Sequence, residues 1–157
     1  MHAEPLPANP WLRATAWVFD TSLAAVPASA LAAALTLPAR LRLMDSTPAS
    51  LEQTAQLLDY LTRLMWILVS QGGLTLAFTA VIYGVGSAVA EGGFHQATWG
   101  KRLVGLRVER MDNQDMDWRQ AAKRFLLGTA SWASLNAGHA MAQFRADRRM
   151  LHDVLAY

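Results

Sequence analysis

The sequence of 157 residues contains no cysteine and few charged residues. The absence of cysteine excludes disulfides, thiolate metal sites and thiol nucleophiles. Charged residues make up 17% of the chain and hydrophobic residues 53%, whereas about a quarter of the residues of ordinary soluble proteins are charged. The chain therefore has less charged surface than a soluble domain of this length needs. The segments without charge indicate where the chain is buried in an apolar environment.

Charge is missing from two long segments. Between residues 14 and 37 the sole charged residue is Asp20, and between residues 64 and 90 there is none. These runs of 24 and 27 residues exceed the roughly 20 that a helix needs to cross a bilayer. Buried helices of small soluble domains are seldom apolar on every side over such a length. We therefore predict an all-α integral membrane protein with one domain, residues 1–157, and transmembrane helices over about 13–37 and 64–90.

A third apolar segment, residues 125–144, is less clear because it contains several polar residues, among them Asn136 and His139. It is predicted either to span the membrane or to enter and leave on one side. Asn136 and His139 are three residues apart, so they share one face of a helix. That face either lines a hydrated cavity or forms hydrogen bonds between helices.

The segment between the second and third apolar runs, residues 91–124, is strongly basic. It carries seven Lys and Arg residues, and the tail (145–157) adds three, whereas the connector 39–50 has Arg40 and Arg42. The positive-inside rule then places this loop and the N-terminus in the cytoplasm of a bacterial-type inner (plasma) membrane, in a multi-pass topology. The loop is expected to contact anionic lipid headgroups.

Local patterns predict secondary structure inside this basic loop. The stretch "LVGLRVER" alternates like a strand, "DNQD" is typical of a turn, and "MDW" reads as a return strand, which together predict a short β-hairpin. Asp117 is the expected N-cap of a following helix.

Asp20 is the one carboxylate inside the first predicted span. A carboxylate facing lipid would cost several kcal/mol, so Asp20 is expected to face protein, water or a cation. Arg13 lies seven residues earlier, on the same face of the helix. Two interpretations stay open: a charged site for ion or proton handling, and a structural pair that fixes helix packing.

Four stretches, "RATAWVFD", "ATWGKRLVGLRVE", "RQAAKR" and "FRADRRMLHD", resemble in this order the RDD family of membrane proteins, which is named for one arginine and two aspartates. The resemblance covers the chain from Arg13 to Asp153. It implies a membrane fold and transport of an unidentified ligand, with cation–proton exchange proposed for some members. By position it matches Arg13, Asp20 and Asp153 to the family's arginine and aspartates, and Thr98, Gly100, Lys101 and Arg107 to its "TxGK…GLRV" stretch.

The function predicted from these patterns is transport of a small ion or solute. The candidate ligand or proton site comprises Arg13, Asp20, Asn136, His139 and Asp153. A second set is assigned to headgroup contact or loop structure: Thr98, Gly100, Lys101 and Arg107.

The alternative is a non-transporting membrane scaffold that acts with a partner protein. Two or three spans are few for a pathway in one monomer, so either role is expected to involve a homo-oligomer or a membrane partner. "TWGK" lacks the glycines of a phosphate-binding loop, and the four histidines share no metal-ligand spacing. We therefore expect no enzymatic activity, no metal or cofactor, and no nucleic acid as a partner.

Overall fold

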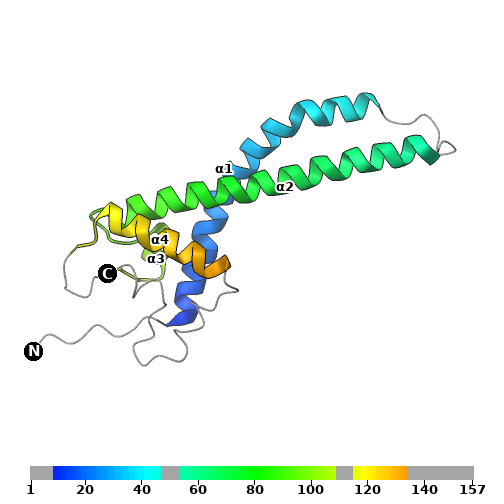
Figure 1. Ribbon diagram of the computed structural model, residues 1–157. Helices are drawn as coiled ribbons and strands as arrows, with labels where there is room; N and C mark the ends of the chain where they lie inside the picture. Colours follow the sequence, from blue (N-terminus) through cyan, green and yellow to red (C-terminus); the bar gives the residue numbers. More distant parts are fainter. Residues whose placement is uncertain (1–8, 47–53, 109–114, 134–157) are drawn as a thin grey trace, which may run out of the picture. The chain divides into compact units, whose positions relative to one another are not determined.

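The computed structural model describes residues 9–46, 54–108 and 115–133 (Figure 1). These residues form four helices: α1 (Pro10–Asp45), α2 (Thr54–Glu91), α3 (Trp99–Leu103) and α4 (Trp118–Ala133). None of the described residues belongs to a β-strand. The predicted all-α class is therefore confirmed over this part of the chain.

The two predicted apolar helices are both present, as α1 and α2. Each is longer than its predicted span, and α1 continues through Pro38, where the span was expected to end. In the most apolar 18 residues of α1 and α2, 22% and 17% of the residues are buried. The core helix of a soluble protein would be mostly buried instead. Both helices are thus long and apolar enough to cross a membrane, and they leave most of their surface uncovered.

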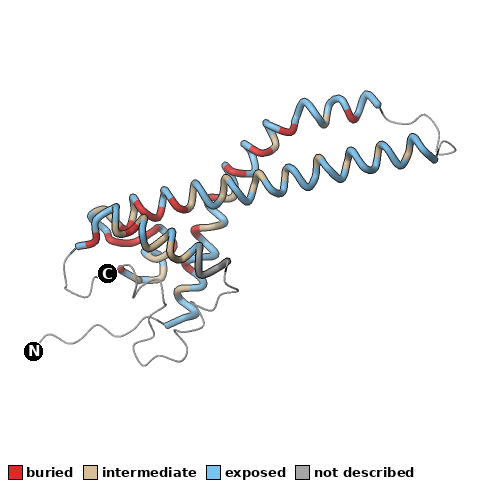
Figure 2. The backbone as a smooth tube through the Cα atoms, viewed as in Figure 1, coloured by how far each residue is buried: buried red, intermediate tan, exposed pale blue. Residues whose placement is uncertain are grey.

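The chain divides into two compact units. One of them, here called the two-helix unit, comprises residues Ser22–Ile82. Small residues follow one another at every fourth position along its part of α1 and are buried: Ala24, Ala28, Ala32 and Thr36 (Figure 2). Between residues 57 and 74 the less exposed positions of α2 are spaced alternately by three and four residues: Leu57, Tyr60, Leu64, Ile67, Gln71 and Leu74. Small residues let two helix backbones approach closely, as is typical of helix pairs in membranes.

The outward faces of the two-helix unit are covered with large apolar side chains. Val26 is 72% exposed and Leu76 74% exposed, and a leucine, valine, methionine or tryptophan occupies many of the other exposed positions. The hydroxyl groups on these helices donate to carbonyl oxygens one turn earlier, as Ser29 does to Ala25 at 2.7 Å and Thr79 to Thr75 at 2.7 Å. Apolar surfaces and internally satisfied polar groups are what a hydrocarbon environment requires.

The second unit, here called the polar unit, comprises residues up to Thr21 and from Tyr83 onward. Its small hydrophobic core joins the end of α2 to α4 and to the segments that flank them, through Ala88, Val108, Met116 and Ala121. Phe125 of α4 packs edge-on against Tyr83 of α2, with 5.7 Å between ring centroids.

The segment predicted as the first hairpin strand instead ends a helix. The N–H of Leu106 donates to the carbonyl of Lys101 at 2.7 Å, and the N–H of Gly105 donates to that of Arg102 at 3.2 Å. Gly105 has φ = 70°, the left-handed conformation that glycine adopts readily. This arrangement is a Schellman motif, which terminates α3. The hairpin is not confirmed. Residues 112–114 of its predicted turn lie outside the described residues, and the predicted return strand "MDW" is not a strand, because Trp118 begins α4.

The helix predicted to follow Asp117 is α4. The Asp117 carboxylate accepts a hydrogen bond from the Gln120 N–H at 2.8 Å, and the Gln120 side chain accepts one from the Asp117 N–H at 3.4 Å. This reciprocal pair is a capping box, so the predicted N-cap is confirmed. α4 contains the beginning of the third apolar segment, and residues 134–144 of that segment lie outside the described residues.

Gly92 allows the end of α2 and the start of α4 to touch. A Cβ atom at this position would lie 2.4 Å from the Trp118 Cα atom. We expect Gly92→Ala to push α4 away and to lower the free energy of unfolding by about 1–3 kcal/mol, the usual cost of overpacking. Thermal unfolding in detergent micelles measures this loss. The control is Gly86→Ala, where no described atom lies within 4 Å of the new Cβ. Equal melting temperatures for the two variants would contradict the contact.

Candidate functional site

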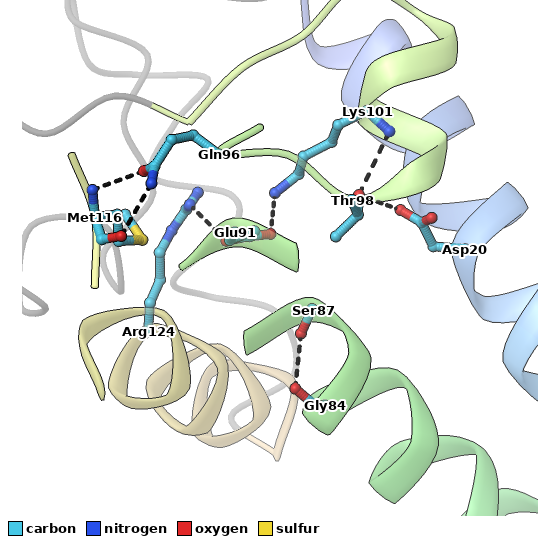
Figure 3. Close-up of polar contacts among 9 residues, drawn as sticks. All are labelled: Asp20, Gly84, Ser87, Glu91, Gln96, Thr98, Lys101, Met116 and Arg124. Atoms are coloured by element: carbon cyan, nitrogen blue, oxygen red, sulfur yellow. Dashed lines mark hydrogen bonds and ion pairs between the residues drawn. The ribbon is translucent and has the colours of Figure 1, made fainter. Parts of the chain in front are cut away.

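Asp20 of α1 is buried in the polar unit, where both of its carboxylate oxygens accept hydrogen bonds. Oδ1 accepts from the backbone N–H of Gly100 at 2.7 Å. Oδ2 accepts from the hydroxyl of Thr98 at 2.5 Å, as Figure 3 shows. The Asp20 residue as a whole is 8% exposed. The carboxylate that the sequence placed in an apolar helix is therefore bonded to the start of α3.

These bonds complete the N-terminal cap of α3. The first N–H groups of a helix have no partner within it. Thr98, the N-cap residue, accepts from the N–H of Lys101 at 3.4 Å, while Asp20 accepts from the N–H of Gly100. A negative charge at this end also suits the helix dipole. Thr98 and Asp20 thus satisfy successive backbone donors, although 78 residues separate them in the chain.

Gly100 is required by the close approach of α3 to α1. A Cβ atom there would lie 2.2 Å from the carbonyl oxygen of Ala16 and 2.9 Å from Oδ2 of Asp20. No side chain fits this space unless one backbone moves. Glycine therefore permits the short bond between its own N–H and Asp20.

A second buried carboxylate, Glu91, ends α2 and was not predicted. Its side chain is 8% exposed and is paired with two basic groups, Lys101 of α3 through Oε1 and Arg124 of α4 through Oε2 at 3.2 Å (Figure 3). A buried carboxylate is costly unless it is paired. Glu91 thus connects three helices of the polar unit. One sequence signal marked it: it is the first charged residue after the uncharged run 64–90.

Gln96 organises the loop between α2 and α3. Its side-chain amide accepts from the N–H of Met116 at 2.6 Å and donates to the Met116 carbonyl at 3.0 Å and to the Gly93 carbonyl at 2.9 Å. Its own carbonyl accepts from the N–H of Val108 at 2.8 Å. Gln96 is 2% exposed and has φ = 49°, an unusual backbone conformation for a residue with a side chain. An isolated glutamine in a loop has no periodicity that would have predicted this role.

The structure brings together part of the predicted set of residues. Thr98 and Gly100 contact Asp20, and Lys101 of the same short helix contacts Glu91. Arg107 is exposed and pairs with Asp115 at 3.0 Å, away from these two carboxylates. Arg13 lies in the first turn of α1 and is partly buried. Three predicted residues lie outside the described residues: Asn136, His139 and Asp153.

The chemistry of this site is that of internal links between helices. Asp20 joins α1 to α3, and Glu91 joins the end of α2 to α3 and α4. Across the described ranges, no three His, Asp or Glu residues come together as a metal site would require. The short helix α3 takes part in both links, so its position depends on two buried carboxylates.

The pairing of Glu91 with Lys101 predicts a large coupling energy. We expect a double-mutant cycle with Glu91→Gln and Lys101→Met, measured by chemical unfolding in mixed micelles, to give about 1–3 kcal/mol, since neither group is well solvated. The control cycle uses Asp115→Asn and Arg107→Met, whose side chains are 81% and 56% exposed. An exposed pair should give less than about 1 kcal/mol. Coupling energies of the same size in both cycles would disprove the structural importance of the buried pair.

Comparison with known proteins yields one family. Neither the curated proteins nor the solved structures contain a match to this chain. The model of the RDD family, in contrast, matches residues 7–157, which include both long apolar helices and the whole polar unit from Tyr83 onward. The family match and the two lipid-compatible helices together identify a membrane protein. The resemblance seen in the sequence is thus confirmed, and the chain belongs to the RDD family.

Proposed function

We propose that this protein is a non-catalytic, non-transporting module of the bacterial inner membrane. In this proposal α1 and α2 anchor the chain in the bilayer, and the polar unit forms a cytoplasmic platform on which a partner membrane protein or a second copy of the chain assembles. The observation that carries the proposal is the pair of hydrogen bonds from Thr98 and Gly100 to Asp20.

These bonds give the intramembrane carboxylate a structural use. Each oxygen of Asp20 has a donor from the start of α3, and the residue is almost fully buried. Glu91 is likewise paired with Lys101 and Arg124. The two buried carboxylates therefore hold α3 and α4 against the long helices, which favours a preformed surface over a group that exchanges with solvent.

The distribution of basic residues supports a cytoplasmic polar unit. The described part of this unit that follows α2 carries Lys101, Arg102, Arg107, Arg119, Lys123 and Arg124. The described residues near the connector between α1 and α2 include three arginines, Arg40, Arg42 and Arg63, and Arg63 is paired with Asp59 at 2.8 Å. By the positive-inside rule, the segment between α1 and α2 faces the periplasm, and the N-terminus is cytoplasmic.

This topology is tested with reporter fusions. A reporter that is active in the periplasm should be on when it is inserted after Ser46 and off when it is inserted after Asp112. The reverse pattern at these two sites would disprove the orientation. A third fusion, after Tyr157, reports on the segment 125–144: periplasmic activity there means a third full span, and its absence means a segment that enters and leaves on one side.

Transport is the second candidate function. It is favoured by the position of Asp20, a buried carboxylate near the beginning of an apolar helix. In this case Asp20 is the protonatable site of a cation–proton exchanger. An oligomer or a partner would then be needed to complete a pathway.

Substitutions of Asp20 distinguish the two functions. Asp20→Ala leaves the Thr98 hydroxyl and the Gly100 N–H without their acceptor, so we expect a loss of about 2–4 kcal/mol in the free energy of unfolding. Asp20→Asn keeps an acceptor for Gly100 and should cost clearly less. The matched control is Asp115→Ala, because that aspartate is exposed.

The same variants are then reconstituted in liposomes that contain a pH-sensitive dye. The platform proposal expects no cation-dependent proton flux from the unmodified protein or from any variant, in Na⁺, K⁺ or Li⁺. Flux that is present in the unmodified protein and absent in Asp20→Asn at equal stability would overturn the platform proposal and establish transport.

A further inference from the structure

The helix α3 has two different sides, and the side that faces out of the polar unit carries a tryptophan, an arginine and a leucine. Gly100 packs against Ala16, and Lys101 points toward Glu91. Trp99, Arg102 and Leu103 occupy positions i, i+3 and i+4, which share one side of a helix. Trp99 is 63% exposed and Leu103 66% exposed, and Arg102 is exposed as well.

The placement of Lys101, Trp99 and Leu103 differs from that expected of a helix on a water-facing surface. Such a helix turns its charged side chains outward and its apolar ones inward. In α3 the lysine is turned inward, to a buried carboxylate, while a tryptophan and a leucine are turned outward. Two large apolar side chains and one arginine therefore share the exposed side of α3.

The composition of the outer side matches the interface of a bilayer. Tryptophan is enriched at the level of the lipid headgroups, where its ring meets both apolar and polar groups. The guanidinium of Arg102 lies 5.0 Å from the centroid of the Trp99 ring. Stacking occupies the face of a guanidinium, and the N–H groups along its edge stay suited to a phosphate.

The same pairing recurs at the start of α4. The guanidinium of Arg119 lies 5.5 Å from the ring centroid of Trp118, which is 60% exposed. Phe94, in the loop before α3, is 95% exposed. Exposed aromatic rings with adjacent arginines are thus a repeated feature of the polar unit, in contrast to the outward faces of the two-helix unit, which are aliphatic for the most part.

We propose that the outer side of α3 lies in the headgroup layer of the membrane and binds anionic phospholipid. Arg102 contacts the lipid phosphate, and Trp99 and Leu103 extend to the boundary of the acyl chains. The sequence assigned headgroup contact to Lys101, whereas the structure pairs Lys101 with Glu91 and turns the neighbouring arginine outward. This inference holds for a platform and for a transporter alike, since it requires only that the chain is in a membrane.

The depth of α3 can be measured because the chain has no cysteine of its own. A single Leu103→Cys is spin-labelled in the full chain, which is reconstituted in vesicles of phosphatidylcholine and phosphatidylglycerol at 3:1. The accessibility of the label to oxygen and to a water-soluble nickel chelate reports its depth. Val69→Cys, on the exposed face of α2, is the reference for lipid, and Asp115→Cys is the reference for water.

We expect the label at position 103 to fall between the two references, with access to oxygen exceeding access to nickel. Trp99→Cys, labelled in the same way, should give the same result and serves if the first variant is unstable. Nickel access at both positions equal to that at Asp115→Cys would overturn the proposal, because α3 would then face water or the site of a protein partner.

The lipid phosphate is tested through the charge of Arg102. The preference of the protein for phosphatidylglycerol over phosphatidylcholine is measured by exchange of fluorescent lipids in nanodiscs. One basic residue near an anionic surface changes such a preference by about fivefold, so Arg102→Gln should reduce it by that factor. Arg107→Gln, which removes an exposed arginine paired with Asp115, should leave it unchanged. An equal effect of both substitutions, or no effect of either, would disprove a specific contact with Arg102.

Discussion

The carboxylate of Asp20 is the group on which the organisation of the polar unit depends. Asp20 caps the start of α3 by accepting hydrogen bonds from the Thr98 hydroxyl and the Gly100 N–H, although it lies 78 residues before Thr98 in the chain. A hydrogen bond to a charged acceptor is stronger than one between neutral groups, and more so where water is excluded. With Asp20 in place, α3 approaches the Ala16 backbone so closely that glycine alone fits at position 100.

The orientation of α3 follows from this contact and from the second carboxylate. Once Asp20 holds the N-terminus of α3, Lys101, the residue after Gly100, meets Glu91, which also pairs with Arg124 of α4. Glu91 stands at the C-terminus of α2, where the helix dipole disfavours a negative charge. The two cations offset that cost. The consequence is a helix whose Lys101 is turned inward and whose Trp99, Arg102 and Leu103 are turned outward.

Membership of the RDD family gives these contacts a wider meaning. The resemblance of "RATAWVFD" to the family implies that Asp20 corresponds to one of its aspartates, and the segment "TWGK" supplies both hydrogen-bond donors to Asp20. A motif in one helix and a motif in the loop are thus two halves of one capping interaction. These hydrogen bonds account for a charged residue inside an otherwise apolar helix without any transported ligand.

The sequence by itself determined the long helices and one local cap. Residues 14–37 and 64–90 are apolar over more than the width of a bilayer, a property that needs no tertiary information, and Asp117 caps α4 through a residue three positions away. The alternation in "LVGLRVER" suggested a strand, but Gly105 uses its left-handed conformation to end a helix, and a pattern of so few residues does not separate the two.

Tertiary structure decided the rest. Glu91, Gln96 and the donors of Asp20 find their partners between 10 and 80 residues away in the chain. Such pairs leave no periodic trace in the sequence, because each is a single polar residue whose partner is chosen by the packing of helices and not by local spacing.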